Sequence, residues 1–407
     1  MIFAGAFVAA GAAQAAQAAE LEVTHWWTSG GEATAAAELA RAFESRTEHA
    51  WLDGAIAGSG GTARPIIISR IIGGDPMGAT QLNHGRQAEE LIRAGLMLDL
   101  TEIAEEQGWR DVVHPSSLLE GCTVDGRVYC VPLNIHSAEW LWLSHQAFED
   151  AGTSVPTTWD EFVAASPALR DAGKVPLAMG GQPWQAALAN GVISMAIAGP
   201  EAWRAVNANL DAEVAAGPEF AAVFQAAADA RAMTRGSNVQ DWNQATNLVI
   251  TGQAGGQIMG DWAQGEFAAA GLTAGEDYSC LPGLGTHDIL STSGDAIYFP
   301  VNDDPEITEA QYDLARVLIS PETQVAFNRL KGSLPVRADV DMADANECME
   351  KGLRILREGT IMASSDQTMS PDTTGQIEDL MAEFWSDPSY GPEDAQTRYA
   401  DIIANAD

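Results

Sequence analysis

Hydrophobic and polar positions alternate at the start of the globular part of the chain. Leu21 and Val23 alternate with polar residues, which predicts a strand. A helix is predicted directly after Glu32, because Ala36, Leu39, Ala40 and Phe43 fall on one helical face, and a strand over 50–57 follows it. Strand and helix signals continue to alternate, which favours the α/β class with mostly parallel sheets.

The later elements follow the same pattern. The chain of 407 residues is long enough for two domains, but no Pro-, Gly- or Ser-rich linker separates them. We therefore expect two lobes that are joined by several short crossings. The further predicted elements are a helix over 65–72, a strand over 77–82, a hairpin at 123–129, helices over 159–169 and 219–233, and a strand over 256–259 that precedes a helix from Trp262.

The first 19 residues are apolar and small, and Ala16-Gln17-Ala18 resembles a signal-peptidase site. This stretch is too short to span a bilayer, so we interpret residues 1–19 as a signal peptide. It lacks a basic segment, and we expect it to be truncated at its start. An Ala-rich terminal helix is the alternative. The mature protein is expected to begin near Ala19 or Glu20 and to be exported to the periplasm.

The charge balance narrows the range of partners. The chain has 57 acidic and only 21 Lys or Arg residues, which gives a formal net charge of −36. A field of this sign repels phosphate backbones and anionic lipids, so nucleic acid and membrane surfaces are disfavoured as partners. A soluble surface, suited to a salty habitat, is the simplest interpretation.

Four cysteines fit an oxidising compartment, and none has the spacing of a metal site. Cys122 and Cys130 flank the Asp125-Gly126 turn, which brings the two arms of a hairpin together. Of three possible pairings we favour Cys122–Cys130 with Cys280–Cys348, and buried free thiols are the alternative.

Aromatic and polar residues gather at predicted strand ends. Trp26, Trp27 and Glu32 follow the first strand, and Asp261 and Trp262 follow the strand over 256–259. Indole faces beside hydrogen-bond acceptors suit a neutral ligand that is rich in hydroxyls. For Trp242 a core position is as plausible as a ligand contact. Lys331 either caps a helix that ends at Gly332 or donates to the ligand.

The order and spacing of five segments resemble the family 1 extracellular solute-binding proteins of bacterial ABC importers, in particular the glucose/mannose-binding branch. The resemblance runs from about Leu21 to the C-terminus. It implies an α/β, two-lobed periplasmic-binding-protein-like fold, with a first lobe of 20–130 plus about 278–322 and a second lobe of about 131–277 plus 323–407. The five segments are 25–32, 182–185, 241–243, 259–262 and 331–337.

The resemblance also implies which residues bind the ligand. Asn83 and Asp366 stand where glucose binders carry Lys or His and a histidine, respectively, so glucose is only the default sugar. The resemblance implies no catalytic residue, cofactor or metal; the partners would be a sugar and ABC permease subunits, and a monomer is expected. The implied ligand-binding residues are Trp26, Trp27, Glu32, Gln81, Asn83, Asn134, Trp242, Asp261, Trp262, Asp295, Lys331 and Asp366.

Two other functions stay open. Glu32, Asp261 and Asp295 could supply the carboxylate pair of a secreted glycoside hydrolase. The same fold could instead bind a non-sugar solute such as an organic anion or a polyamine. Gly58–Thr62 matches no phosphate-loop pattern, and we expect it to form a turn that lines the cleft.

Overall fold

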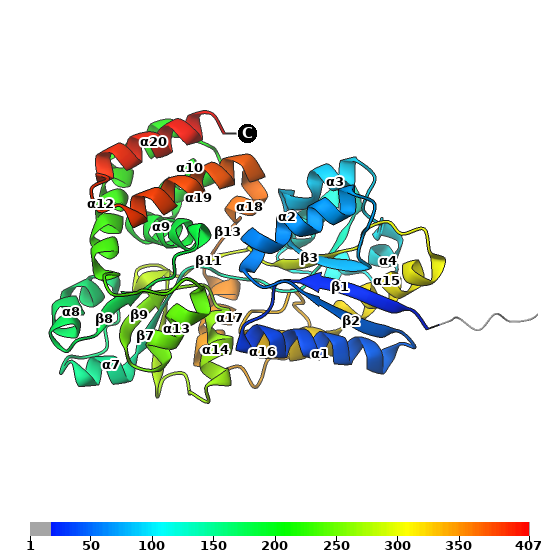
Figure 1. Cartoon of the computed structure of the whole chain (residues 1–407), viewed down its shortest axis with the longest axis horizontal. Helices are drawn as coiled ribbons and strands as arrows, with labels where there is room; N and C mark the ends of the chain where they lie inside the picture. Colours follow the sequence, from blue (N-terminus) through cyan, green and yellow to red (C-terminus); the bar gives the residue numbers. More distant parts are fainter. Residues whose placement is uncertain (1–17, 407) are drawn as a thin grey trace, which may run out of the picture.

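The computed structural model describes residues 18–406, so nearly all of the predicted signal peptide lies outside the described residues. Two lobes lie side by side, and each has a central sheet with helices on both faces (Figure 1). This confirms the two-lobed α/β fold. In the described part of the chain no helix is both long and apolar enough to cross a membrane.

The sheet of the first lobe has the strand order β2-β1-β3-β12-β6. β1 pairs in parallel with β2 and β3, whereas β12 runs antiparallel to both β3 and β6. The expectation of mostly parallel sheets is therefore wrong, because a strand from much later in the chain enters this sheet in the opposite direction. The strands are β1 (Glu20–His25), β2 (Ala50–Ala55), β3 (Ala79–Asn83), β6 (Cys130–Pro132) and β12 (Asp295–Tyr298).

Helices cover this sheet because their apolar faces match it. In α1 the side chains of Ala36, Leu39 and Phe43 are buried, as the periodicity predicts, and Ala40 of the same predicted face is partly buried. α16 packs along α1 (Figure 1). The helices of this lobe are α1 (Gly30–Arg46), α2 (Ser59–Ile72), α3 (Glu89–Arg93), α4 (Thr101–Glu106), α5 (Trp109–Val112), α6 (Ser117–Glu120), α15 (Pro305–Leu318) and α16 (Pro321–Lys331).

The sheet of the second lobe has the order β10-β7-β9-β8, and only β8 and β9 are parallel. Its strands are β7 (Trp140–Ser144), β8 (Val175–Ala178), β9 (Ala254–Ile258) and β10 (Tyr278–Pro282). Its helices are α7 (His145–Asp150), α8 (Trp159–Asp171), α9 (Pro183–Ile197), α10 (Gly199–Asn207), α11 (Ala212–Ala215), α12 (Pro218–Met233), α13 (Trp242–Ile250), α14 (Ala263–Ala269), α19 (Pro371–Ser386) and α20 (Pro392–Ala404).

Short elements complete the chain. β11 pairs with β13 in the middle of the molecule (Figure 1). The β4–β5 hairpin forms at the expected Asp-Gly turn. Both expected disulfides, Cys122–Cys130 and Cys280–Cys348, are present, with Cα atoms 5.1 and 6.0 Å apart. These elements are β4 (Thr123–Val124), β5 (Arg127–Val128), β11 (Ile289–Ser291), β13 (Thr360–Met362), α17 (Glu347–Glu358) and α18 (Ser365–Thr368).

The sheets divide the chain differently from the expected lobe boundaries at two places. β10 lies in the second sheet, although the first lobe was expected to resume at about 278. α16 packs on α1 of the first lobe, although the second lobe was expected to resume at 323. The chain therefore returns from the second sheet to the first between β10 and β12, and β12 begins at Asp295. α16, which packs on the first lobe, ends at Lys331.

Candidate ligand-binding site

A cavity of about 300 Å³ lies between the lobes and is lined by both of them. From the first lobe it receives Trp26 at the end of β1 and the first turn of α2, and from the second lobe Trp242 and Trp262. Ser59, Gly60 and Gly61 line the cavity, as expected for Gly58–Thr62, but they form the start of a helix rather than a turn.

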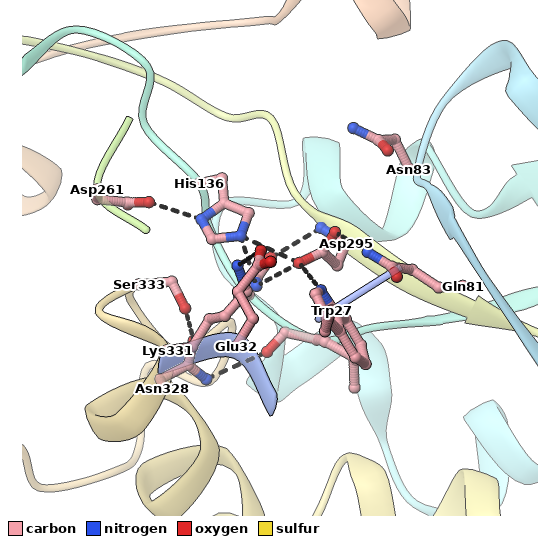
Figure 2. A network of polar contacts seen from close by, with 12 residues as sticks. Trp27, Glu32, Gln81, Asn83, His136, Asp261, Asp295, Asn328, Lys331 and Ser333 are labelled. Atoms are coloured by element: carbon pink, nitrogen blue, oxygen red, sulfur yellow. Dashed lines mark hydrogen bonds and ion pairs between the residues drawn. The ribbon is translucent and has the colours of Figure 1, made fainter. Parts of the chain in front are cut away.

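Asp295, at the start of β12, lies at the centre of the polar network (Figure 2). Its Oδ2 atom accepts hydrogen bonds from Trp27 Nε1 at 3.3 Å and from Asn134 Nδ2 at 3.0 Å. Its Oδ1 atom accepts one from Gln81 Nε2 at 2.7 Å. The carboxylate is only 5% exposed and lines the cavity. Oδ1, with a single protein donor, has the greater remaining capacity to accept a ligand hydroxyl.

His136 connects the carboxylates of the two lobes (Figure 2). Its Nδ1 atom lies 2.6 Å from Asp261 Oδ1, and its Nε2 atom lies 3.0 Å from Asp295 Oδ2. Burial disfavours the charged ring, but the two carboxylates raise the pKa of His136 above its ordinary value. Burial also works against ionisation of Asp295, yet His136, Lys331 and Asn134 hold its pKa well below the usual range. The two carboxylates thus favour the protonated form of the His136 ring, and His136 favours the ionised form of Asp295.

Lys331, the last residue of α16, forms a buried ion pair with Glu32 of α1. Its Nζ atom lies 2.7 Å from Glu32 Oε1, and the two residues are 2% and 7% exposed. Burial opposes the ammonium, but Glu32 and Asp295 raise the pKa of Lys331. Gly332 ends the helix with φ +86°, as the sequence predicts for a C-cap. The Lys331 ammonium is bound to Glu32 and not to the last carbonyls of the helix, and Glu32 and Lys331 both line the cavity.

Indole rings form the walls of the cavity. Trp262 lies 5.0 Å from His136 in an edge-on arrangement and 6.2 Å from Trp184, measured between ring centroids. Trp242, at the first position of α13, is 6% exposed and also lines the cavity. Trp26 completes the set from the first lobe, and its backbone N–H donates to Gln81 Oε1 at 2.9 Å. Flat apolar faces from both lobes thus surround the acceptors.

Trp27 does not face this cavity. It is 1% exposed, stacks on His25 with centroids 5.3 Å apart, and packs against Phe327 of α16. Its role as a ligand platform is therefore wrong, and its contact with the site is the hydrogen bond to Asp295. The reason lies in extended backbone geometry, since successive side chains such as those of Trp26 and Trp27 point to opposite sides.

The two residues that depart from the family pattern contact each other. Asn83 Nδ2 donates to Asp366 Oδ2 at 3.2 Å, and both residues line the cavity. Burial raises the pKa of Asp366, while the nearby Arg64 guanidinium lowers it. Arg64 also lies 6.0 Å from the centre of the Trp26 ring. The cavity is therefore lined by an amide–carboxyl pair at the place where the family resemblance led us to expect a histidine ring.

Eight of the twelve implied residues line the cavity. The other four do not line it but are hydrogen-bonded to Asp295 or His136, which do. These four residues are Trp27, Gln81, Asn134 and Asp261. The sequence analysis missed Trp184, although it lies inside the segment 182–185, and His136, which comes two positions after Asn134; it also missed Arg64 and Glu139. The eight lining residues are Trp26, Glu32, Asn83, Trp242, Trp262, Asp295, Lys331 and Asp366.

Comparison with known proteins agrees with this architecture. The family model for the bacterial extracellular solute-binding proteins matches residues 55–325. A "probable sugar-binding periplasmic protein" of Rhizobium meliloti is 36% identical over 360 residues, which cover 87% of this chain and 86% of the relative. A protein of the same description from Mesorhizobium japonicum is 34% identical over 402 residues, covering 97% and 95%.

Among solved structures, a chitin oligosaccharide binding protein shares the fold with a TM-score of 0.78 at 20% identity. The match covers 96% of this chain and 99% of that one. At this identity the likeness concerns the fold alone. The family match, the long relatives and the two-lobed fold lead to one conclusion: the chain belongs to the bacterial extracellular solute-binding proteins, the exported receptors of ABC importers that its motifs resemble.

Proposed function

We propose that the protein binds a neutral sugar, with a glucose-like monosaccharide as the default, and delivers it to the permease of an ABC importer. The observation that carries this proposal is that tryptophans from both lobes line the same cavity as the buried carboxylate Asp295. Indole faces suit the apolar faces of a pyranose ring, and the fixed acceptors suit its hydroxyls. The sugar-binding descriptions of the long relatives agree with this chemistry.

We further propose capture by closure of the lobes around the sugar. Besides those of His136, contacts between the lobes near the cavity include the hydrogen bonds from the Gly31 backbone N–H to Glu266 Oε1 at 2.8 Å and from Gln182 Nε2 to Ser59 Oγ at 3.3 Å. Such contacts can form and break, whereas a ligand that touches both lobes favours the closed form through its differential affinity. One chain supplies both walls of the cavity, which fits a monomer.

Binding without catalysis is favoured over glycoside hydrolysis. A hydrolase needs a carboxylic acid that gives a proton to the glycosidic oxygen. Glu32 is bound by Lys331, Asp295 is held as a carboxylate by His136, and Asp261 lies behind the imidazole. None of these three residues is placed to act as the acid. Glu139 also lines the cavity, and burial raises its pKa to about 7, so it is a further candidate acid that the glycoside assay tests. Nitrophenyl glycosides are expected to give no turnover.

A non-sugar ligand is the second alternative, and the charges of the cavity bear on it. An organic anion would meet Asp295 and Asp366. Of the two cations that line the cavity, Lys331 is already paired with Glu32, and Arg64 lies close enough to Asp366 to lower its pKa. A polyamine would have to compete with His136 for Asp295, and Lys331 is a further positive charge in the same cavity. A neutral ligand avoids both conflicts.

Isothermal titration with a panel of monosaccharides tests the proposal, and Trp262→Ala provides the matched variant. Loss of this indole should weaken sugar binding by roughly 1–3 kcal/mol, the usual range for a large apolar side chain. Trp51→Ala, on β2 and outside the cavity, serves as the control and should bind as the unaltered protein does. The absence of heat with every sugar, or an unchanged dissociation constant for Trp262→Ala, would contradict the proposal.

A further inference from the structure

The cavity continues beyond the site around Asp295 into the second lobe. There it is lined by a separate set of residues, which we call the inner chamber: Asn190, Gly191 and Met195 of α9, Trp203 and Asn207 of α10, and Met369, which precedes α19. None of these residues belongs to the ligand set that the family resemblance implies. Glu139 and Ser364 also line the cavity but are not counted among the residues of the inner chamber.

Gly191 leaves space open in this chamber. It lies in the interior of α9, where glycine destabilises a helix by roughly 0.5–1 kcal/mol relative to alanine. A Cβ atom at this position would meet no atom within 4 Å, so no close packing contact requires a glycine there. A larger side chain would instead project into open space. The glycine therefore keeps part of the chamber free.

Two buried polar groups on the cavity wall have no partner. The Asn190 side chain is 4% exposed and its Oδ1 atom accepts no hydrogen bond, and Ser364 is 6% exposed with an unpaired hydroxyl. A buried polar atom without a partner costs free energy, which a ligand that carries hydroxyls can recover. Both groups line the cavity that holds Asp295, so one ligand can reach from one site to the other.

The rest of the chamber has the character of a sugar subsite. Trp203 is 5% exposed and, with Met195 and Met369, supplies apolar surface. The Lys and Arg residues that line the cavity in the described part of the chain are Arg64 and Lys331, and both come from the first lobe. An anionic group in the chamber would have no cation beside it. Apolar faces next to unpaired amide and hydroxyl groups suit a neutral polyol ring.

We propose that the inner chamber binds the second ring of a disaccharide whose other ring lies against Asp295. This inference rests on the proposed sugar-binding function and specifies its substrate class. Asn190 would donate to and accept from hydroxyls of the second ring, Trp203 would cover one of its faces, and the space beside Gly191 would hold the ring itself.

Titration of matched variants tests the proposal. The probes are glucose, galactose and mannose, and their α-1,4-, β-1,4-, α-1,6- and β-1,6-linked disaccharides. The unaltered protein should bind one disaccharide about tenfold or more tightly than the corresponding monosaccharide, a difference of ~1.4 kcal/mol. Gly191→Leu should abolish that gain and keep the monosaccharide dissociation constant within about twofold. Gly375→Leu, at a glycine of α19 that also has open space but does not line the cavity, is the control.

Asn190→Ala provides an independent variant in case Gly191→Leu does not fold, as judged by circular dichroism. It should weaken the disaccharide and spare the monosaccharide. The inference is overturned if monosaccharides bind and no disaccharide binds more tightly, or if both chamber variants leave disaccharide binding intact. If no sugar of either size binds, the proposed function itself fails, and the inference fails with it.

Discussion

At the scale of single residues, the buried acids of the cavity are stabilised in opposite ways. Asp295 is surrounded by donors and stays ionised, whereas Glu139, which is 1% exposed, is hydrogen-bonded by Ser291, whose backbone N–H donates to its Oε2 atom at 3.0 Å. Burial raises the pKa of Glu139 to about 7, and the nearby charge of Asp261 adds to the effect. The neutral form of Glu139 is therefore present over a range in which most carboxyls are ionised.

We predict that Glu139→Gln stabilises the protein at pH 8 and has little effect at pH 4.5. Below the ordinary value of 4.5 neither the folded nor the unfolded state is charged at this residue. As the pH rises from 4.5 to about 7, the unfolded state loses this proton before the folded state does, so the free energy of unfolding falls. Above pH 7 the loss is complete and amounts to on the order of 3 kcal/mol. Denaturant unfolding of both proteins at the two pH values measures the difference. Glu102→Gln, at an exposed site of α4, controls for the lost charge. A gain independent of pH would contradict this account.

Residue types at strand ends could be predicted from the sequence, but the direction of each side chain could not. Trp26 and Asp295 line the cavity as expected, whereas Gln81 and Asn134 support Asp295 from within the protein. His136 was missed because a single histidine carries no sequence signal for two carboxylates. Its partners, Asp261 and Asp295, come from different sheets and are brought together only by the tertiary fold.

At the scale of elements, helix ends marked by glycine were the easiest to predict. α16 ends at Lys331 because Gly332 adopts the left-handed conformation, and its N–H donates to Asn328 O at 2.9 Å. The start of α2 was not predicted, because the composition of Gly58–Thr62 is typical of a turn, whereas the helix begins at Ser59 and runs through Gly60 and Gly61. The antiparallel entry of β12 was also missed, since no local pattern specifies strand direction.

Gly332→Ala is predicted to destabilise the protein and to weaken sugar binding. The left-handed conformation alone costs an L-residue roughly 1–2 kcal/mol. In addition, a Cβ atom would lie 2.8 Å from Asp261 O and 2.9 Å from Gln264 Cβ, so the backbone beside the cavity must shift. Urea unfolding and titration with the bound sugar measure both effects. Gly375→Ala, in open space within α19, should instead be neutral or slightly stabilising. Equal stabilities for the two variants would contradict the prediction.

At the scale of the whole molecule, the acidic excess dominates the long-range electrostatics. With 57 acidic and 21 Lys or Arg residues, the ion pairs described above can neutralise only a minority of the carboxylates. The remaining negative charges repel one another in the compact state more than in the unfolded chain. The sequence alone predicts this property, because it depends on composition and not on the fold.

We therefore predict that the melting temperature rises with NaCl concentration and levels off near physiological ionic strength. The screening length falls from about 30 Å at 0.01 M to about 10 Å at 0.1 M, so most of the repulsion is removed in this range. Differential scanning calorimetry over 0.01–1 M NaCl at pH 7.5 measures the effect. A melting temperature that is constant up to 0.3 M and rises only at higher concentration would indicate salt exclusion from the surface instead.

The position of β12 between β3 and β6 has a consequence for how the chain is made. Gln81 and Asp295, which are hydrogen-bonded to each other, are 214 positions apart, and all four strands of the second sheet are synthesised between them. The first lobe therefore cannot complete its sheet as it emerges from the ribosome. Contacts of such long range slow folding, so the nascent chain stays incompletely folded, with its future binding surface unassembled, until most of it has been translated.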